Sequence, residues 1–399
     1  MMKLNFLSQL TFRSNPEYQL VESGNLNRPE QEALAGLLHD AEVFGIFKPS
    51  PPNNDASYKL AYKEVALLFY SLQQPGKLPL YMRNSFDDDI NNTLAKLVME
   101  GIMQISSGEH FVSGTKAQDI LYERKSVVSN NIATGIAQQS ASAIQYALHL
   151  NELDSRSLGI RLYCYNTAPL IPESSNAFSS TEEVENFLGV GKNDPFAWEI
   201  LKHWDKHAPT EKYKWIAWNR KKNTKPHPTQ HSIFKIYISP VLSSFPDVFV
   251  KSVRVLTRSK AFSFKTGTDR HGLLRPDKFV VYFYSFDDLI EASDMLKDAL
   301  KDYEAQGVPF TAQLDDKGMI SWGIDPAEKE VLENFEGGSW RAGVTEKLGA
   351  AVVQAKADGL TKDKAMEYIL NKISLEGIDP FNWIPIQKTK VAKNFLQTT

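Results

Sequence analysis

Two lysines inside strand-like runs are the residues of this chain whose types and spacing point most directly to chemistry. Lys235 lies in Phe234-Lys235-Ile236-Tyr237-Ile238-Ser239, and Lys265 ends Phe262-Ser263-Phe264-Lys265. In a strand, side chains alternate between faces, so Lys235 and Tyr237 share a face, as do Ser263 and Lys265. A lysine that is partly desolvated, or that lies beside another cation, has a lowered pKa and can act as a base. The alternative is a solvated face, which antiparallel sheets often keep.

A short basic segment follows the second lysine. Arg270, His271, Arg275 and Lys278 lie within nine positions of one another. Arginine suits bidentate binding of phosphate or carboxylate, and His271 could protonate a leaving group near neutral pH. We expect Gly267 and Gly272 to permit tight turns here. The alternative is a solvated loop whose arginines pair with Asp269 and Asp277.

Composition sets limits on the class of protein. The 399 residues favour two or three domains, and the net charge of −3 disfavours a protein that binds nucleic acid through its overall field. Cys164 is the single cysteine, which excludes an intramolecular disulfide and agrees with a reducing cytosol. It lies in a strand-like run, so we expect a buried thiol. The sequence shows no signal peptide or membrane-length apolar stretch, which predicts a cytoplasmic protein that does not enter the membrane.

The elements expected in the first part of the chain are mostly helices. Apolar residues recur at helical spacing over 58–72, 90–103 and 132–150, with shorter helices at 181–188 and 194–207 and a strand at 158–165. The polar, proline-punctuated stretch 221–230 is typical of a linker. We therefore expect a mainly helical region at 1–225 and a second domain at 226–399.

The second domain alternates strands and helices. Strands are expected at 233–239, 261–265, 279–284, 309–313 and 319–322, with helices at 245–256 and 286–303. A turn is expected at 315–318, and further helices at 328–334, 340–357 and 361–373. The predicted fold class is α+β, with a small βαββαββ unit that carries both lysines.

Other motifs give weaker signals. His203 and His207 have helical i, i+4 spacing, and a surface pair is favoured over a metal site because no third ligand is near in sequence. Tyr213, Trp215 and Trp218 lie among lysines and could stack on a ligand, bind a peptide partner or simply pack. The sequence has no phosphate loop, dinucleotide fingerprint or kinase signature.

The stretch from Phe234 to Trp322 resembles the phosphothreonine lyases. These comprise bacterial type III effector lyases and the lyase domains of class III lanthipeptide synthetases. Their order is aromatic-Lys-x-His-x-Ser, a helix, Phe-Lys, a basic loop with arginine, and a strand ending in tyrosine. The segments 273–278, 307–312 and 321–323 are more similar to stand-alone lyases of the Hop effector A type, from class V lanthipeptide and thioamitide pathways. The resemblance covers about a quarter of the chain.

The resemblance implies β-elimination of phosphate from phosphothreonine or phosphoserine in a peptide, without metal or cofactor. Lys265 matches the base that removes the Cα proton, and Lys235 the cation beside the developing enolate. Arg275 matches the phosphate-binding arginine. The further phosphate-binding candidates are Arg270, Lys278, Tyr282 and Tyr284.

One position departs from the family pattern. Tyr237 stands where the family has its acid histidine. Tyr237 could serve as the acid if neighbouring lysines lower its pKa, His271 could replace it, or the phosphate could leave as a dianion held by arginines. Two other interpretations stay open: a non-catalytic effector-like protein that binds a phosphorylated partner, and a helical scaffold with a solvated basic loop.

The same resemblance sets the expected partners. The substrate would be a phosphorylated ribosomal precursor peptide with a leader, made by a separate kinase, and a cyclase is a further candidate partner. We expect the N-terminal region to hold the leader or dock the kinase.

Overall fold

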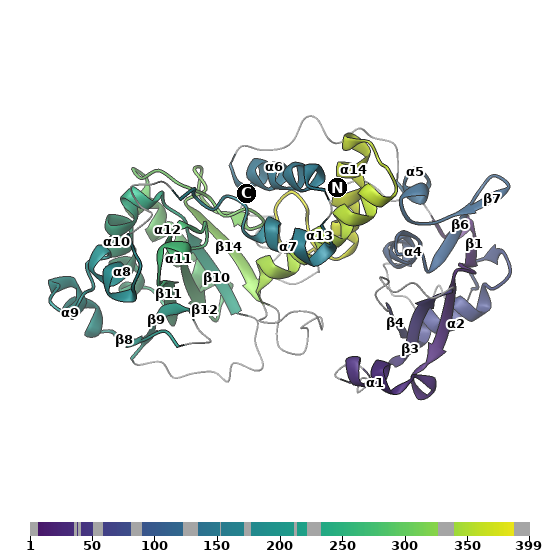
Figure 1. The fold of residues 1–399 in the computed structure, drawn as a ribbon, viewed down its shortest axis with the longest axis horizontal. Coiled ribbons are helices and arrows are strands. Elements are labelled where there is room, and N and C mark those ends of the chain that lie inside the picture. Colours follow the sequence, from purple (N-terminus) through teal and green to yellow (C-terminus); the bar gives the residue numbers. More distant parts are fainter. Residues whose placement is uncertain are drawn as a thin grey trace. The chain divides into compact units, whose positions relative to one another are not determined.

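A computed structural model describes the chain in two compact units, formed by 1–129 with 357–376 and by 130–356 with 377–399 (Figure 1). Helices and strands occur in both, which confirms the α+β class. None of the helices in the described part combines the length and apolar character needed to cross a membrane. The described residues are 7–35, 38, 41–50, 59–80, 90–122, 135–151, 153–170, 177–210, 214–221, 233–325 and 339–386.

The second unit is built on a seven-stranded antiparallel sheet of order β13-β14-β10-β12-β11-β9-β8. Its strands are β8 (Trp204–His207), β9 (Trp215–Arg220), β10 (Ile233–Ile238), β11 (Ser263–Gly267), β12 (Phe279–Phe283), β13 (Ala312–Gln313) and β14 (Ile320–Asp325). The helices of this unit are α6 (Ile136–His149), α7 (Ser155–Tyr163), α8 (Thr181–Phe187), α9 (Pro195–Leu201), α10 (Phe245–Arg258), α11 (Arg270–Leu274), α12 (Phe286–Leu300) and α13 (Trp340–Ala357).

One face of this sheet forms the main hydrophobic core. Alternate residues of β10, β11 and β12, such as Ile236, Phe264 and Val281, are fully buried against α10 and α12. These two helices present apolar residues at helical spacing, as the sequence predicts, for example Phe249, Val253 and Leu256 on α10. The opposite face carries Lys235 and Lys265, because successive side chains of a strand point to opposite faces of the sheet.

The predicted βαββαββ order is present from β10 to β14, but the sheet is larger. β9 pairs with β11, placing Lys265 opposite Ala217, and β8 pairs with β9 at the edge. Sequence reasoning ended the helical region at residue 225, whereas these two strands before that point share the sheet of the second unit. Most of the expected linker, from 222 to 230, lies outside the described residues, as do Tyr213 and the expected helix at 328–334.

The first unit contains more strand than the sequence indicated. One sheet has the order β5-β1-β6-β7 and another β2-β3-β4. Its strands are β1 (Thr11–Ser14), β2 (Tyr18–Glu22), β3 (Val43–Pro49), β4 (Lys59–Tyr62), β5 (Gly76–Lys77), β6 (Met103–Ser107) and β7 (His110–Val112). Its helices are α1 (Arg28–Ala33), α2 (Lys63–Ser71), α4 (Ile90–Met99), α5 (Gln118–Leu121) and α14 (Lys362–Leu375). The sequence did not indicate these strands, because they are short and lack a long alternating pattern.

Helix α14 belongs to the first unit although it lies far away in sequence. Lys372 on α14 is 3.1 Å from a carboxylate oxygen of Glu100, which also binds Lys59. Burial by itself would raise the pKa of Glu100, but the two lysines outweigh it and lower that pKa to about 2. A charged, partly buried cluster thus ties the helix to the first unit.

Three local expectations in the second unit were wrong. The segment expected as a strand at 158–165 is mostly the helix α7, whose N-cap Asp154 accepts a hydrogen bond from the backbone N–H of Ser157 at 2.6 Å. Cys164 follows this helix and is exposed, not buried. The helix expected to reach His207 ends at Leu201, and His207 lies on β8, so His203 and His207 do not share a helical face.

Candidate active site

Lys235 and Lys265 lie on the same face of the sheet but not on neighbouring strands. Lys235 on β10 stands opposite Tyr282 on β12, and Lys265 on β11 stands opposite Val280 on the same strand. β12 therefore separates the two lysine strands. Directly opposed residues in an antiparallel pair point to the same side, so Lys235, Tyr282 and Lys265 all project from one face.

The lysine face is not a solvated face. Lys235 is only 7% exposed and forms an ion pair with Asp325, the last residue of β14. Burial, together with the nearby charge of Lys235, lowers the pKa of Lys265 to about 8. At pH 7 about a tenth of Lys265 side chains would then be neutral amines, far more than for an ordinary lysine.

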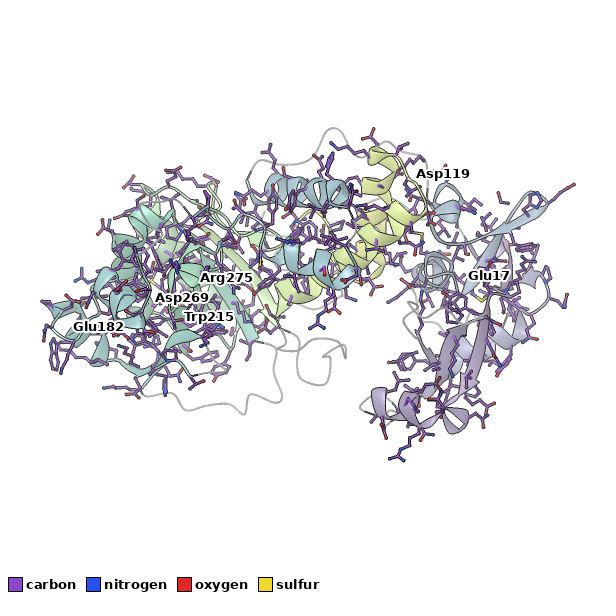
Figure 2. The ribbon with its side chains drawn as sticks, viewed as in Figure 1. Glu17, Asp119, Glu182, Trp215, Asp269 and Arg275 are labelled. Atoms are coloured by element: carbon purple, nitrogen blue, oxygen red, sulfur yellow. The ribbon has the colours of Figure 1, made fainter. Side chains whose placement is uncertain are left out.

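Aromatic rings contact the cations of this site. The Lys265 Nζ is 4.3 Å from the centroid of the Trp215 ring and 5.6 Å from that of Tyr282. The Lys235 Nζ is 5.3 Å from the Tyr282 ring, and the Arg275 Cζ is 5.4 Å from the Trp215 ring. Trp215 and Arg275 are labelled in Figure 2. Three cations therefore lie along one series of ring faces.

Arg275 is held in a fixed orientation at the end of that series. Its Nε and Nη2 each donate to Asp277 at 2.8 Å, and Nη2 also donates to the Tyr163 hydroxyl at 2.9 Å. Its side chain is 30% exposed. Burial acts to lower the pKa of Arg275, but the Asp277 carboxylate outweighs it and raises that pKa. The bidentate bond leaves Nη1 on the outer side of the guanidinium, directed away from Asp277.

A second, fully buried arginine shares the same carboxylate. Arg341 on α13 has its Nη1 2.8 Å from Asp277, and its Nη2 donates to the backbone carbonyl of Tyr163 at 2.7 Å. Burial by itself would raise the pKa of Asp277, but Arg341 and Arg275 hold it well below its usual range. Asp277 is therefore an anion that fixes both arginines.

Tyr237 does not have the environment that its role as an acid would require. Its side chain is 3% exposed, and burial, reinforced by the charge of Asp325, raises its pKa well above the usual value. One of the three alternatives for the acid required neighbouring lysines to lower that pKa, and this condition is not met. The correction has a simple cause: the hydroxyl is buried near carboxylates, which disfavour a phenolate.

The other sequence candidates take different positions. Lys278 is fully buried and donates to the carbonyl of Pro240 at 2.9 Å and to Gln306, so it holds the fold and does not reach a phosphate. His271 is exposed on α11, and the Arg270 backbone N–H donates to the Phe178 carbonyl at 2.9 Å. Tyr284 lies just past β12 and stacks on Phe262, with ring centroids 4.0 Å apart.

The basic segment is a short helix and not an open loop. Asp269 caps α11 by accepting a hydrogen bond from the Gly272 N–H at 2.8 Å, while Asp277 pairs with Arg275. Neither Gly267 nor Gly272 has a positive φ. A Cβ on Gly267 would lie 2.6 Å from backbone atoms of Gly272, so glycine is required here by close approach and not by a turn.

Sequence reasoning missed several members of the site. Asp325 could have been found from the alternation of β14, because it shares a face with Gly323 and Ser321, opposite Lys235 and Tyr237. Trp215 was noticed only as part of an aromatic cluster. Tyr163 and Arg341 gave no sequence signal, because they reach the site from two helices far apart in the chain.

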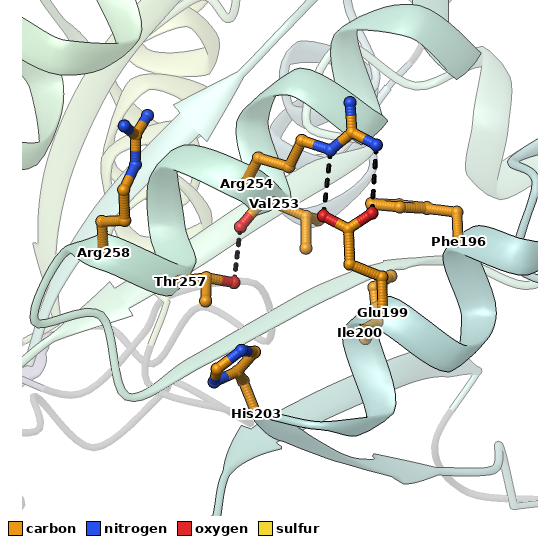
Figure 3. Close-up of a pocket in the computed structure, with 8 residues that line it drawn as sticks. All are labelled: Phe196, Glu199, Ile200, His203, Val253, Arg254, Thr257 and Arg258. Atoms are coloured by element: carbon orange, nitrogen blue, oxygen red, sulfur yellow. Dashed lines mark hydrogen bonds and ion pairs between the residues drawn. The ribbon is translucent and has the colours of Figure 1, made fainter.

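The hollow shown in Figure 3 is on another part of this unit. It has a volume of about 250 Å³ and lies between α9 and α10, where Arg254 forms a bidentate ion pair with Glu199. Its lining residue Val253 belongs to the core on the far face of the sheet from the lysines. It is therefore separate from the cationic site.

Comparisons with known proteins find likeness only among solved structures. No family model matches the chain, and no curated protein matches its sequence. The structure of an effector protein from Pseudomonas syringae pv. tomato strain DC3000 is 16% identical, with TM-score 0.40, over 62% of this chain and 95% of the other. The type III effector/phosphothreonine lyase OspF from Shigella flexneri is 15% identical, with TM-score 0.27, over 34% and 80%. The Salmonella phosphothreonine lyase SpvC is 13% identical, with TM-score 0.25, over 44% and 98%.

Proposed function

We propose that this chain is a metal-independent phosphothreonine/phosphoserine lyase. The observation that carries the proposal is Lys265, whose pKa is about 8 and whose amine lies on one face with Lys235 and close to Arg275. Such a face combines a base with two cations, which is what removal of a weakly acidic proton beside a leaving phosphate requires.

The proposed reaction is a β-elimination. The neutral Lys265 amine takes the Cα proton of the phosphorylated residue, and the electron pair of that C–H bond forms the Cα=Cβ double bond. The Cβ–O bond breaks, its electrons leave with the phosphate, and the departing bridging oxygen takes up a proton from solvent. Lys235 stabilises the negative charge that develops on the carbonyl oxygen, while Arg275 binds the phosphate. The products are dehydrobutyrine or dehydroalanine and inorganic phosphate.

A second candidate function is binding of a phosphorylated protein or peptide without catalysis. The observation that favours it is Tyr237, which is buried with a raised pKa at the position of the family's acid histidine. A cationic face that lacks a working acid could still hold a phosphate.

The two functions are separated by incubating the full chain with a phosphothreonine peptide and following loss of phosphoric acid by mass spectrometry. We predict that Lys265→Ala reduces elimination by about 10²–10⁴-fold, since this is what proton removal by a positioned base typically contributes. Lys265→Arg keeps the cation but supplies no base, so it should bind the phosphopeptide and not eliminate.

The matched control is Lys260→Ala, which removes a surface lysine whose side chain is 68% exposed. Full elimination by Lys265→Ala would overturn the mechanism, and binding without elimination by the unaltered chain would select the second function.

We propose a ribosomal precursor peptide with a leader as the substrate, in lanthipeptide-type biosynthesis in the cytoplasm. This context rests on the motif resemblance of residues 273–278, 307–312 and 321–323. A separate kinase would supply the phosphate, a cyclase would act on the product, and the first unit would dock the leader or the kinase. Co-expression followed by pull-down of the full chain tests this, and recovery of neither precursor nor kinase would count against it.

A further inference from the structure

Shared aromatic rings link the cations of the candidate site in a series of contacts. Along the series, Lys235 is followed by the Tyr282 ring, Lys265, the Trp215 ring, Arg275 and finally the Tyr163 ring, whose centroid is 5.1 Å from the Arg275 Cζ. Trp215 is the ring that contacts both the proposed base and the proposed phosphate-binding arginine. It comes from β9, where it lies opposite Gly267 of the lysine strand β11.

This arrangement addresses a physical problem of the site. Like charges held a few ångströms apart, away from water, repel one another strongly. The face of an aromatic ring carries partial negative charge and attracts a cation on either side. A ring that contacts two cations therefore attracts both, and its surface also shields the lysine beside it from water.

We propose that Trp215 is a positioning residue that links the proposed base, Lys265, to the proposed phosphate-binding residue, Arg275. It sets the proton affinity of Lys265 by excluding water, and it fixes Arg275 together with Tyr163 and Asp277. This inference rests on the proposed function, because it assigns Trp215 a part in the same reaction.

Two effects of the Trp215 ring on Lys265 oppose each other. The ring face attracts the ammonium ion, which favours the charged form, whereas the exclusion of water disfavours it. Burial is the main cause of the lowered Lys265 pKa, and we infer that the Trp215 ring supplies enough of that burial to outweigh its attraction for the ammonium ion. Removing the ring should therefore raise that pKa.

The test compares Trp215→Ala with Trp215→Phe, which keeps a ring face. The pH dependence of Lys265 acetylation by acetic anhydride, read by mass spectrometry of its peptide, gives the pKa without relying on activity. For Trp215→Ala we expect the midpoint to rise from about 8 by roughly one unit, and phosphothreonine-peptide affinity to fall about tenfold. In Trp215→Phe both should stay close to the unaltered chain. The control is Trp198→Ala, since Trp198 is 65% exposed on α9.

An unchanged or lowered midpoint in Trp215→Ala, with circular dichroism like that of the unaltered chain, would overturn the inference. If Trp215→Ala does not fold, Trp215→Leu keeps the bulk without the ring, and unchanged phosphopeptide affinity in that variant would overturn it as well. If the unaltered chain shows no elimination while the midpoint still rises in Trp215→Ala, the proposed function fails and the positioning role stands.

Discussion

At the scale of single residues, the proposed elimination depends on whether the Lys265 amine carries a proton. Burial and the charge of Lys235 lower its pKa to about 8, and the rings of Trp215 and Tyr282 line its amine. Lys235, on the same face of the sheet, pairs with Asp325. Two lysines on one face thus have different surroundings, which is how one residue type can serve as a base and as a fixed cation.

This difference predicts a pH dependence. The base must be neutral, so the rate of phosphate elimination should rise with pH up to about 8 and level off above it, because the free-amine fraction of Lys265 saturates there. Single-turnover rates with a phosphothreonine peptide between about pH 6 and 10 would measure it. A rate that is flat across this range, or that falls as pH rises through 8, would contradict the assignment of Lys265 as the base.

At the scale of elements, two packing relations build the site. Antiparallel pairing through β12 places Lys235 and Lys265 on one face, although their strands do not touch. α11 packs directly on the end of β11 through Gly267 and Gly272, and the chain then runs to Arg275. The approach of these two glycines therefore sets how far the arginine lies from the lysine strand.

Gly272→Ala should disturb this contact. Its Cβ would lie 2.7 Å from the Cα of Gly267, so backbone must shift, which we expect to cost about 1–3 kcal/mol of stability. The shift should also weaken phosphopeptide binding, since Arg275 follows α11. Urea unfolding and binding titrations measure the two effects. Gly24→Ala is the comparison, because a Cβ there would meet nothing within 4 Å. Equal stability of the Gly272→Ala variant and the unaltered chain would count against the required close approach.

At the scale of the whole molecule, the second unit is held together around Asp277. Its carboxylate contacts Arg275 before β12, Tyr163 at the end of α7, and Arg341 at the start of α13. These three partners are far apart in the sequence. The same carboxylate that orients Arg275, the proposed phosphate-binding residue, therefore also joins the helices to the sheet.

We predict that Asp277→Asn destabilises the second unit by about 3 kcal/mol, because it leaves the buried Arg341 without its counter-ion. All seven tryptophans belong to this unit, so urea unfolding followed by intrinsic fluorescence reports on it. The matched control is Asp294→Asn. The Asp294 carboxylate is 64% exposed in a surface ion pair, so its loss should change the stability by less than about 1 kcal/mol.

The pH dependence of this effect has a definite sign. Folding lowers the pKa of Asp277, so its contribution to stability is complete above the usual aspartate pKa of about 4 and is lost as the pH falls toward the folded value. The stability difference between the unaltered chain and Asp277→Asn should shrink on acidification. A difference that stays constant between pH 7 and about pH 3 would argue against the charge as its origin.

The sequence by itself determined the elements with strong periodicity. α10, α12 and the strands from β10 to β14 follow from alternating and helical patterns in one continuous segment, and with them the shared face of Lys235 and Tyr237. Lys265 and Arg275 could be identified as candidates because their residue types and order are local properties of the chain.

Only the tertiary structure decided how these residues behave. The fold places β12 between the lysine strands, includes β8 and β9 from before residue 225 in the same sheet, and brings Tyr163 and Arg341 into contact with Asp277. It also buried Tyr237 and Lys278, which sequence reasoning had assigned to proton transfer and phosphate binding. The physical reason is that burial and pKa depend on contacts between segments distant in sequence, whereas periodicity reports only on the segment in which it occurs.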